Sequence, residues 1–186
     1  MLNTQTAIKT RKLQVGVHTV TLKSAEIETT KTGRTLIKVY FHNNLGEIDR
    51  AIWLPNLDQV KPYDGESTEE AKDREIRNFM QEIVTITSAV CPEDPHMSAE
   101  SVEKLANLFC AKVKNLGDRK VNLVVQYDKD SEYTEVPKKR YGYIEPHNEE
   151  DTSHNLILTS FRMLPEKATG AYTVPSKGTQ SDDLPF

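Results

Sequence analysis

Two runs of alternating residues joined by a turn decide the fold of this chain: TLIKVYFH (35–42), NNLG (43–46) and EIDRAIWL (47–54). Successive side chains of a strand point to opposite sides, so the first run has one apolar face, made of Ile37, Val39 and Phe41. Asn and Gly tolerate positive φ, and Pro55 has no N–H for a ladder. The stretch therefore predicts an antiparallel hairpin that ends near residue 54.

A third strand is predicted before the hairpin. From Gly16 the chain alternates up to Leu22, and the apolar positions then change phase to Ala25 and Ile27, as in a bulged or bent strand. Thr32 and Gly33 supply the turn into the hairpin. The first part of the chain is thus predicted to form a three-stranded meander.

The apolar period of the chain becomes helical after residue 66. Ser67 and Glu70 have the spacing of a capping box, and Cys91-Pro92 ends the apolar stripe that follows. A second helix is predicted to begin at Ser98 and to close at Asn115-Leu116-Gly117. Stripes of this kind are typical of packing against a core.

Strands are predicted again at 121–127, 138–144 and 156–164. Three strands, a helical connection and further strands match a five-stranded Greek-key barrel of the oligonucleotide/oligosaccharide-binding (OB) type. The class is mainly β with an α insertion, in which the connection between strands 3 and 4 is expanded to two helices and an extra terminal strand is present. We expect one domain over 1–164, because 186 residues suffice for one core.

The end of the chain loses this pattern. Residues 165–181 are small, polar or helix-breaking, which predicts a disordered linker. The last five residues are Asp182, Asp183, Leu184, Pro185 and Phe186. This acidic tip resembles the C-terminus of bacterial and phage single-stranded DNA-binding proteins, in which it recruits replication, recombination and repair enzymes. The resemblance covers five residues and implies the same partner-binding role here.

Two further features relate to that family. The strand that reads LIKVYF after a Lys-Thr-Gly turn is similar to phage members. Bacterial members of the common type carry one short helix between strands 3 and 4, whereas two are predicted here, so the chain looks like a divergent phage protein. The family implies a location in the cytoplasm of a bacterial host, and no apolar run reaches transmembrane length.

Coating a single strand requires cations that follow the phosphates and rings on which bases stack. The net charge of −4 excludes a uniformly basic surface but permits a basic groove. The residues expected to form it are Arg34, Lys38, Tyr40, Arg50, Trp53, Lys138, Lys139, Arg140, Tyr141 and Tyr143. Each group of these residues has an alternative interpretation. The tyrosines could be ordinary strand residues, because aromatic residues favour sheets regardless of function. Trp53, between two apolar neighbours, could be a core residue, and the basic cluster could be a solvated sheet edge.

The expected function is non-enzymatic coating of single-stranded DNA without sequence specificity, with partner enzymes recruited by the tip. The acidic tip could also occupy the basic groove when DNA is absent. A strand-annealing recombinase could use the same groove. A metal nuclease would need carboxylates such as Glu47 with Asp49, or Asp128, Asp130 and Glu132. An RNA-binding module is a further rival. We expect no cofactor, no metal and no catalytic residue; the sequence does not set the oligomeric state.

Overall fold

The computed structural model describes residues 11–129, 131, 133–138, 142–151 and 153–163. The predicted linker 165–181 and the tip, Asp182 to Phe186, lie outside the described residues, as do Lys139, Arg140 and Tyr141.

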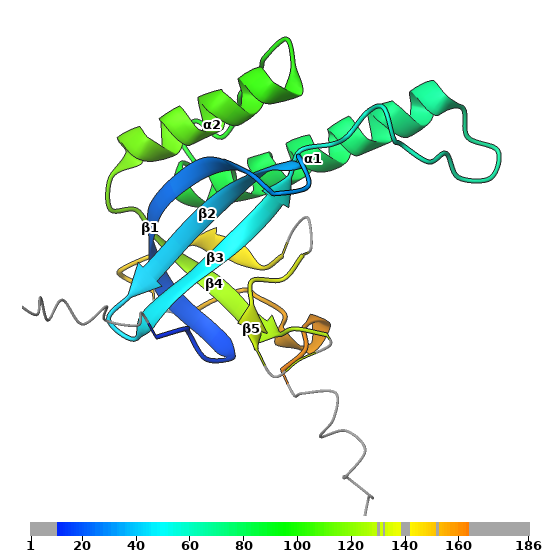
Figure 1. The fold of residues 1–186 in the computed structure, drawn as a ribbon. Coiled ribbons are helices and arrows are strands. Elements are labelled where there is room, and N and C mark those ends of the chain that lie inside the picture. The colour runs from blue at the N-terminus through cyan, green and yellow to red at the C-terminus, as the bar shows by residue number, and fades with distance from the viewer. Residues whose placement is uncertain (1–10, 130, 132, 139–141, 152, 164–186) are drawn as a thin grey trace, which may run out of the picture.

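A curled antiparallel sheet forms the body of the protein (Figure 1). The meander consists of β1 (Gly16–Thr29), β2 (Thr35–Asn43) and β3 (Gly46–Trp53). On the other side of β1 lies β4 (Lys120–Tyr127), which pairs with β5 (Thr134–Glu135) and β6 (Ile144–Pro146). The main strand order is β3-β2-β1-β4-β5. The predicted mainly β architecture, with helices between strands 3 and 4, is confirmed.

The bend in β1 allows this strand to pair with β4 along its first half and with β2 along its second half. Residues 16–21 pair with β4, and residues 21–29 pair with β2. The register with β2 shifts between Leu22 and Ser24, so one extra residue is accommodated there. This is the place where the apolar pattern changes phase in the sequence, and the predicted bulge is confirmed.

Two helices connect β3 to β4: α1 (Thr68–Val90) and α2 (Val102–Leu116). The predicted capping box is present, because the Ser67 hydroxyl accepts from the Glu70 amide and the Glu70 carboxylate accepts from the Ser67 amide. The predicted start of α2 at Ser98 is wrong. Ser101 is the N-cap and accepts from the Lys104 amide, while Gly117 with φ of 65° ends the helix as predicted.

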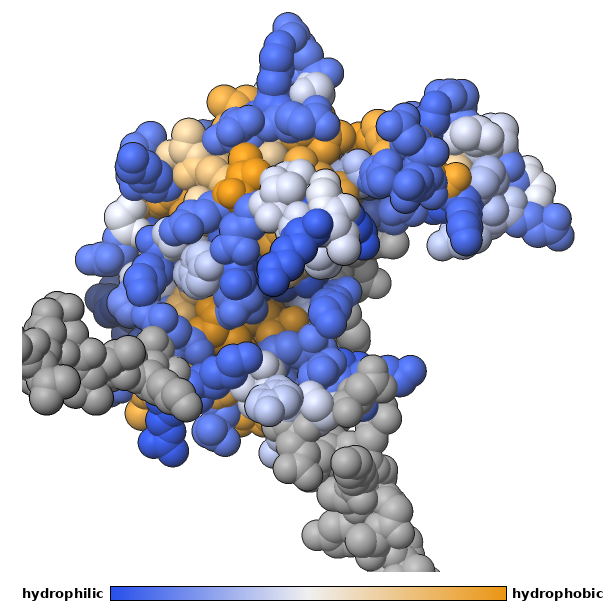
Figure 2. Space-filling view, viewed as in Figure 1, coloured by the Kyte–Doolittle hydropathy of each residue, from blue (hydrophilic) through white to orange (hydrophobic). Residues whose placement is uncertain are grey.

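From Ile76 onward, α1 is packed against the core. Ala71 is the one buried residue of its first turns, and the next buried residue is Phe79. The N-terminal part of α1 therefore projects past the sheet, with the β3–α1 connection running beside it (Figure 1). Hydrophilic residues dominate this projection, whereas hydrophobic ones gather where the helices meet the sheet (Figure 2). No helix of the described residues combines the length and the apolar character needed to cross a membrane.

An N-terminal segment, which the sequence did not predict to pair, closes one end of the core. Lys12 forms a parallel bridge with Glu47, and the Glu47 amide donates to the Arg11 carbonyl at 2.8 Å. A Cβ on Gly46 would lie 1.9 Å from that carbonyl oxygen, so only glycine permits this approach. The result is that Leu13 is buried in the core.

Two predicted strands of the C-terminal part are wrong. Of the described residues in the range 138–144, which are 138 and 142–144, only Ile144 belongs to a strand, because Pro137 has no N–H to donate and Gly142 adopts φ of 78°. In the range 156–164, the described residues form no strand and include a short 3₁₀ helix, Leu158–Ser160. Here the chain is held instead by Arg162, whose carbonyl accepts from the Tyr127 amide and whose amide donates to the Gln126 side chain.

Candidate nucleic-acid interface

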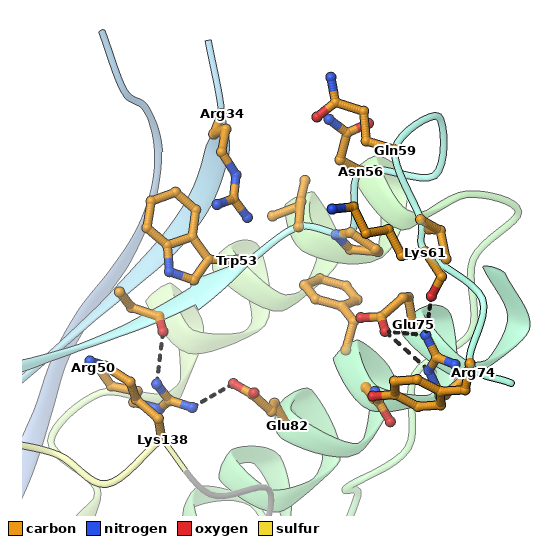
Figure 3. A pocket seen from close by; sticks show the side chains of 17 residues that line it. Arg34, Arg50, Trp53, Asn56, Gln59, Lys61, Arg74, Glu75, Glu82 and Lys138 are labelled. Atoms are coloured by element: carbon orange, nitrogen blue, oxygen red, sulfur yellow. Dashed lines mark hydrogen bonds and ion pairs between the residues drawn. The ribbon is translucent and has the colours of Figure 1, made fainter. Parts of the chain in front are cut away.

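A groove of about 730 Å³ lies between the end of β3, the connection 54–67 and α1 (Figure 3). Five cations and two carboxylates are among its lining residues: Arg34, Arg50, Lys61, Arg74 and Lys138 with Glu75 and Glu82. The chain as a whole carries a net charge of −4, whereas the residues lining this groove include more cations than carboxylates; Arg50, Arg74 and Lys138 are each paired with a carboxylate. A local excess of cations attracts a polyanion whatever the net charge of the protein.

The first ring of the groove is Trp53, at the end of β3. Its side chain is on the outer face of the sheet and 43% exposed. The Arg34 guanidinium lies over this ring, 4.4 Å from the centroid (Figure 3). Of the two interpretations that the sequence left open for Trp53, a core residue or a surface ring, the structure shows the surface ring.

The second ring is Tyr63, from the β3–α1 connection, and it is 70% exposed. The guanidinium of Arg74 lies 3.8 Å from its centroid. Arg74 also forms ion pairs with Glu66 and Glu75 and donates to the Lys61 carbonyl at 3.2 Å. These contacts fasten the connection to α1 and hold Tyr63 in place.

Sequence reasoning missed Lys61, Tyr63 and Arg74. The stretch from Pro55 to Gly65 reads as a polar connection, and the helix stripe drew attention to its apolar face. The available signal was an aromatic residue in a turn-rich connection, where no strand explains the ring.

Arg50 lies beneath the groove, on the core-facing side of β3. It is 4% exposed, it pairs with Glu82 at 2.8 Å, and it donates to the Ala51 carbonyl at 2.9 Å. Among the described residues its Nε has no hydrogen-bond partner. The pair joins β3 to α1, the two elements between which the groove lies.

Tyr143 was predicted to offer its ring to bases, and that placement is wrong. Gly142 turns the backbone, and the Tyr143 side chain is fully buried, with its ring 5.9 Å from the Arg50 guanidinium carbon. Burial raises the pKa of Tyr143 to about 12, although the positive charge of Arg50 acts in the opposite direction. This ring therefore supports the core below the groove.

The raised pKa of Tyr143 gives an expected pH dependence of stability. Between pH of about 10 and about 12 the unfolded state loses the phenol proton while the folded state keeps it. Stability should therefore fall as pH rises through this window, by up to about 1.4 kcal/mol per pH unit. Urea unfolding at several pH values measures the slope. Tyr143→Phe should flatten it, and an unchanged slope in that variant would contradict the assignment.

Lys38 and Tyr40 lie apart from the groove, on the outer face of β2 among carboxylates. The Tyr40 hydroxyl donates to Glu28 at 3.0 Å, and Lys38 lies 4.0 Å from the same carboxylate. Partial burial acts to lower the pKa of Lys38, but Asp49, Tyr40 and Glu28 together outweigh it and raise the pKa. The predicted single aromatic and basic face is thus divided. Side chains alternate between the two faces of the sheet, and Arg50 of β3 is on the side opposite to Lys38 of β2.

Lys138 connects the groove to a neighbouring hollow of about 600 Å³, because it lines both. Its side chain is largely exposed and pairs with Glu135 at 3.0 Å. Of the predicted cations, Arg34, Arg50 and Lys138 thus meet at the groove.

Comparison with models of known protein families, with curated proteins and with solved structures finds no match for this chain. Within the described ranges, no group of three or more His, Cys, Asp or Glu side chains is placed to hold a metal ion.

Proposed function

We propose that the protein binds single-stranded DNA without sequence specificity and without catalysis, through the groove beside β3. One observation carries the proposal: two exposed rings, Trp53 and Tyr63, border one groove with an excess of cations. Every base has a π-face, so ring stacking is tolerant of sequence, and cations follow the phosphates of any strand. A duplex keeps its bases stacked internally and cannot offer them to these rings.

The strand order supports an OB-type barrel as the fold behind this function. In the described residues β1 lies between β2 and β4, the sheet curls so that β5 reaches β3, and the helices lie between β3 and β4. OB-folds bind oligonucleotides on the face of strands 2 and 3 and on the loop between strands 1 and 2. Trp53 lies on β3 and Arg34 follows the β1–β2 turn, which fits that use.

The C-terminal tip completes the proposal. Its resemblance to single-stranded DNA-binding proteins of bacteria and phages supports a division into a binding domain, 1–164, a linker, 165–181, and a partner-binding tip, Asp182 to Phe186. In this proposal the tip recruits replication and recombination enzymes to the coated strand, as in a phage-infected bacterial cell.

Titration of oligo-dT against duplex DNA at two salt concentrations tests the central claim. Trp53 is the only tryptophan of the chain, so its emission reports binding at the groove. We expect tighter binding to the single strand, with log K falling against log salt by about 0.7 per phosphate contact. Equal affinity for oligo-dT and duplex would refute the proposed function.

A further inference from the structure

The contact between Arg34 and Trp53 has the features of one in which the guanidinium can leave the ring and be replaced by another group. The Arg34 backbone is held in the β1–β2 turn, where its amide donates to the Thr30 hydroxyl at 3.1 Å and its carbonyl accepts from the Thr30 amide at 2.8 Å. Its side chain makes no hydrogen bond or ion pair with any other described residue, and its guanidinium lies against the Trp53 ring. The guanidinium can thus leave the ring while the turn stays in place.

The contact between Arg74 and Tyr63 is different in kind. Arg74 is fixed by Glu66, by Glu75 and by the Lys61 carbonyl, so its guanidinium stays on one side of the tyrosine ring. Tyr63 is nevertheless 70% exposed, and most of its ring is open. One groove therefore carries one ring with a fixed cation and one ring with a movable cation.

We propose that the Arg34 guanidinium occupies the face of Trp53 on which a base stacks, and that it moves to a backbone phosphate when a strand binds. Trp53 is thereby selective for bases carried on an anionic backbone. This inference rests on the proposed function and names the residue that determines specificity at the same site.

The selectivity follows from competition for one ring face. A guanidinium and a base both use the π-face of tryptophan, so a base stacks on that face only after the guanidinium leaves. The lost cation–π contact weakens binding about two- to fivefold at an exposed site. A phosphate compensates for this loss, because it accepts charge-assisted hydrogen bonds from the released guanidinium. A ligand that carries its bases on an uncharged backbone cannot form these hydrogen bonds.

Arg34→Ala, compared on two ligands, tests the exchange. The ligands are oligo-dT and a methylphosphonate oligo-dT of the same length, which carries the same bases on an uncharged backbone. We expect weaker binding of ordinary oligo-dT, with a salt slope smaller by about 0.7, and two- to fivefold tighter binding of the uncharged strand. Anisotropy of a labelled strand measures both, independently of Trp53 emission. Arg34→Lys keeps the charge and should retain the salt slope.

Tyr63→Ala serves as the matched control, because the cation of this ring does not move. It should weaken both ligands by a similar factor. If Arg34→Ala weakens both ligands equally, the guanidinium stays on the ring with the base, and the exchange is overturned. If it changes neither, the contact has no role, and the exchange is overturned as well. Failure of the proposed function is separate: wild-type protein would then show no preference for oligo-dT over duplex.

Discussion

Trp53→Ala combined with Tyr63→Ala is expected to remove most of the affinity for oligo-dT. Each base stacked on an aromatic side chain contributes about 1–3 kcal/mol, so loss of two platforms weakens binding by roughly 30-fold to 10⁴-fold. Both rings are exposed, so the fold should tolerate the change. The salt slope should change little, because the cations of the groove remain. Anisotropy titration of labelled oligo-dT measures the loss.

Tyr133→Ala is the matched control for this double variant. Tyr133 is as exposed as Tyr63 but is not among the residues that line the groove. We expect it to bind oligo-dT as the wild type does. If the control loses as much affinity as the double variant, or if the double variant keeps wild-type affinity, the groove is not where bases stack.

Glu82→Gln is expected to lower the free energy of unfolding by about 3–5 kcal/mol, because it leaves the charge of Arg50 buried without its partner. The side chain keeps its shape, so the effect reports charge and hydrogen bonding rather than a cavity. Urea unfolding measures the change. Because this ion pair joins β3 to α1, the variant should also weaken oligo-dT binding when it is assayed well below its unfolding midpoint.

Two comparisons separate the buried pair from ion pairs in general. Glu100 lies just before α2 and forms an exposed ion pair with Lys104 in the first turn of that helix. Glu100→Gln breaks this pair and should lower the free energy of unfolding by only about 0.3–0.5 kcal/mol. Arg50→Met with Glu82→Leu removes both charges together and should recover most of the stability, because no unpaired charge remains. A small loss in Glu82→Gln, similar to that in Glu100→Gln, would show that Arg50 is solvated in the folded protein.

The parts of the fold that sequence could predict are those fixed by local chemistry. The β2–β3 hairpin follows from alternation and from the turn at 43–46. The start of α1 follows from Ser67 and Glu70, which satisfy each other's backbone amides, and the bend of β1 follows from a change of phase within one strand. Each of these signals is contained within about a dozen residues.

The parts that could not be predicted depend on distant segments. β5 and β6 are two and three residues long, and they exist because β4, which pairs with β1 along one edge, leaves its other edge open to them. Leu13 becomes a core residue only because Gly46 admits the backbone of Arg11. Ser98 and Ser101 are equally good caps in the sequence, and the structure shows that Ser101 is the N-cap.

The candidate site shows the same division. Trp53 and Arg34 were singled out as residue types, but their stacking depends on the register that brings the end of β3 beside the β1–β2 turn. Tyr63 and Arg74 meet because the connection folds back along α1. Tyr143 was assigned to the surface because the turn at Gly142 was read as part of a strand.

The central position of β1 determines the order in which the protein can assemble. Its first half pairs with β4, and Thr19 bonds Asn122 across 103 positions of the chain. During synthesis the meander emerges long before β4. Until β4 is made, one edge of β1 is unpaired and can associate with other chains. Such non-local closure gives a high contact order and slow folding, on the order of milliseconds to seconds. Ribosome-bound chains that end after α2 should therefore be the most prone to aggregate.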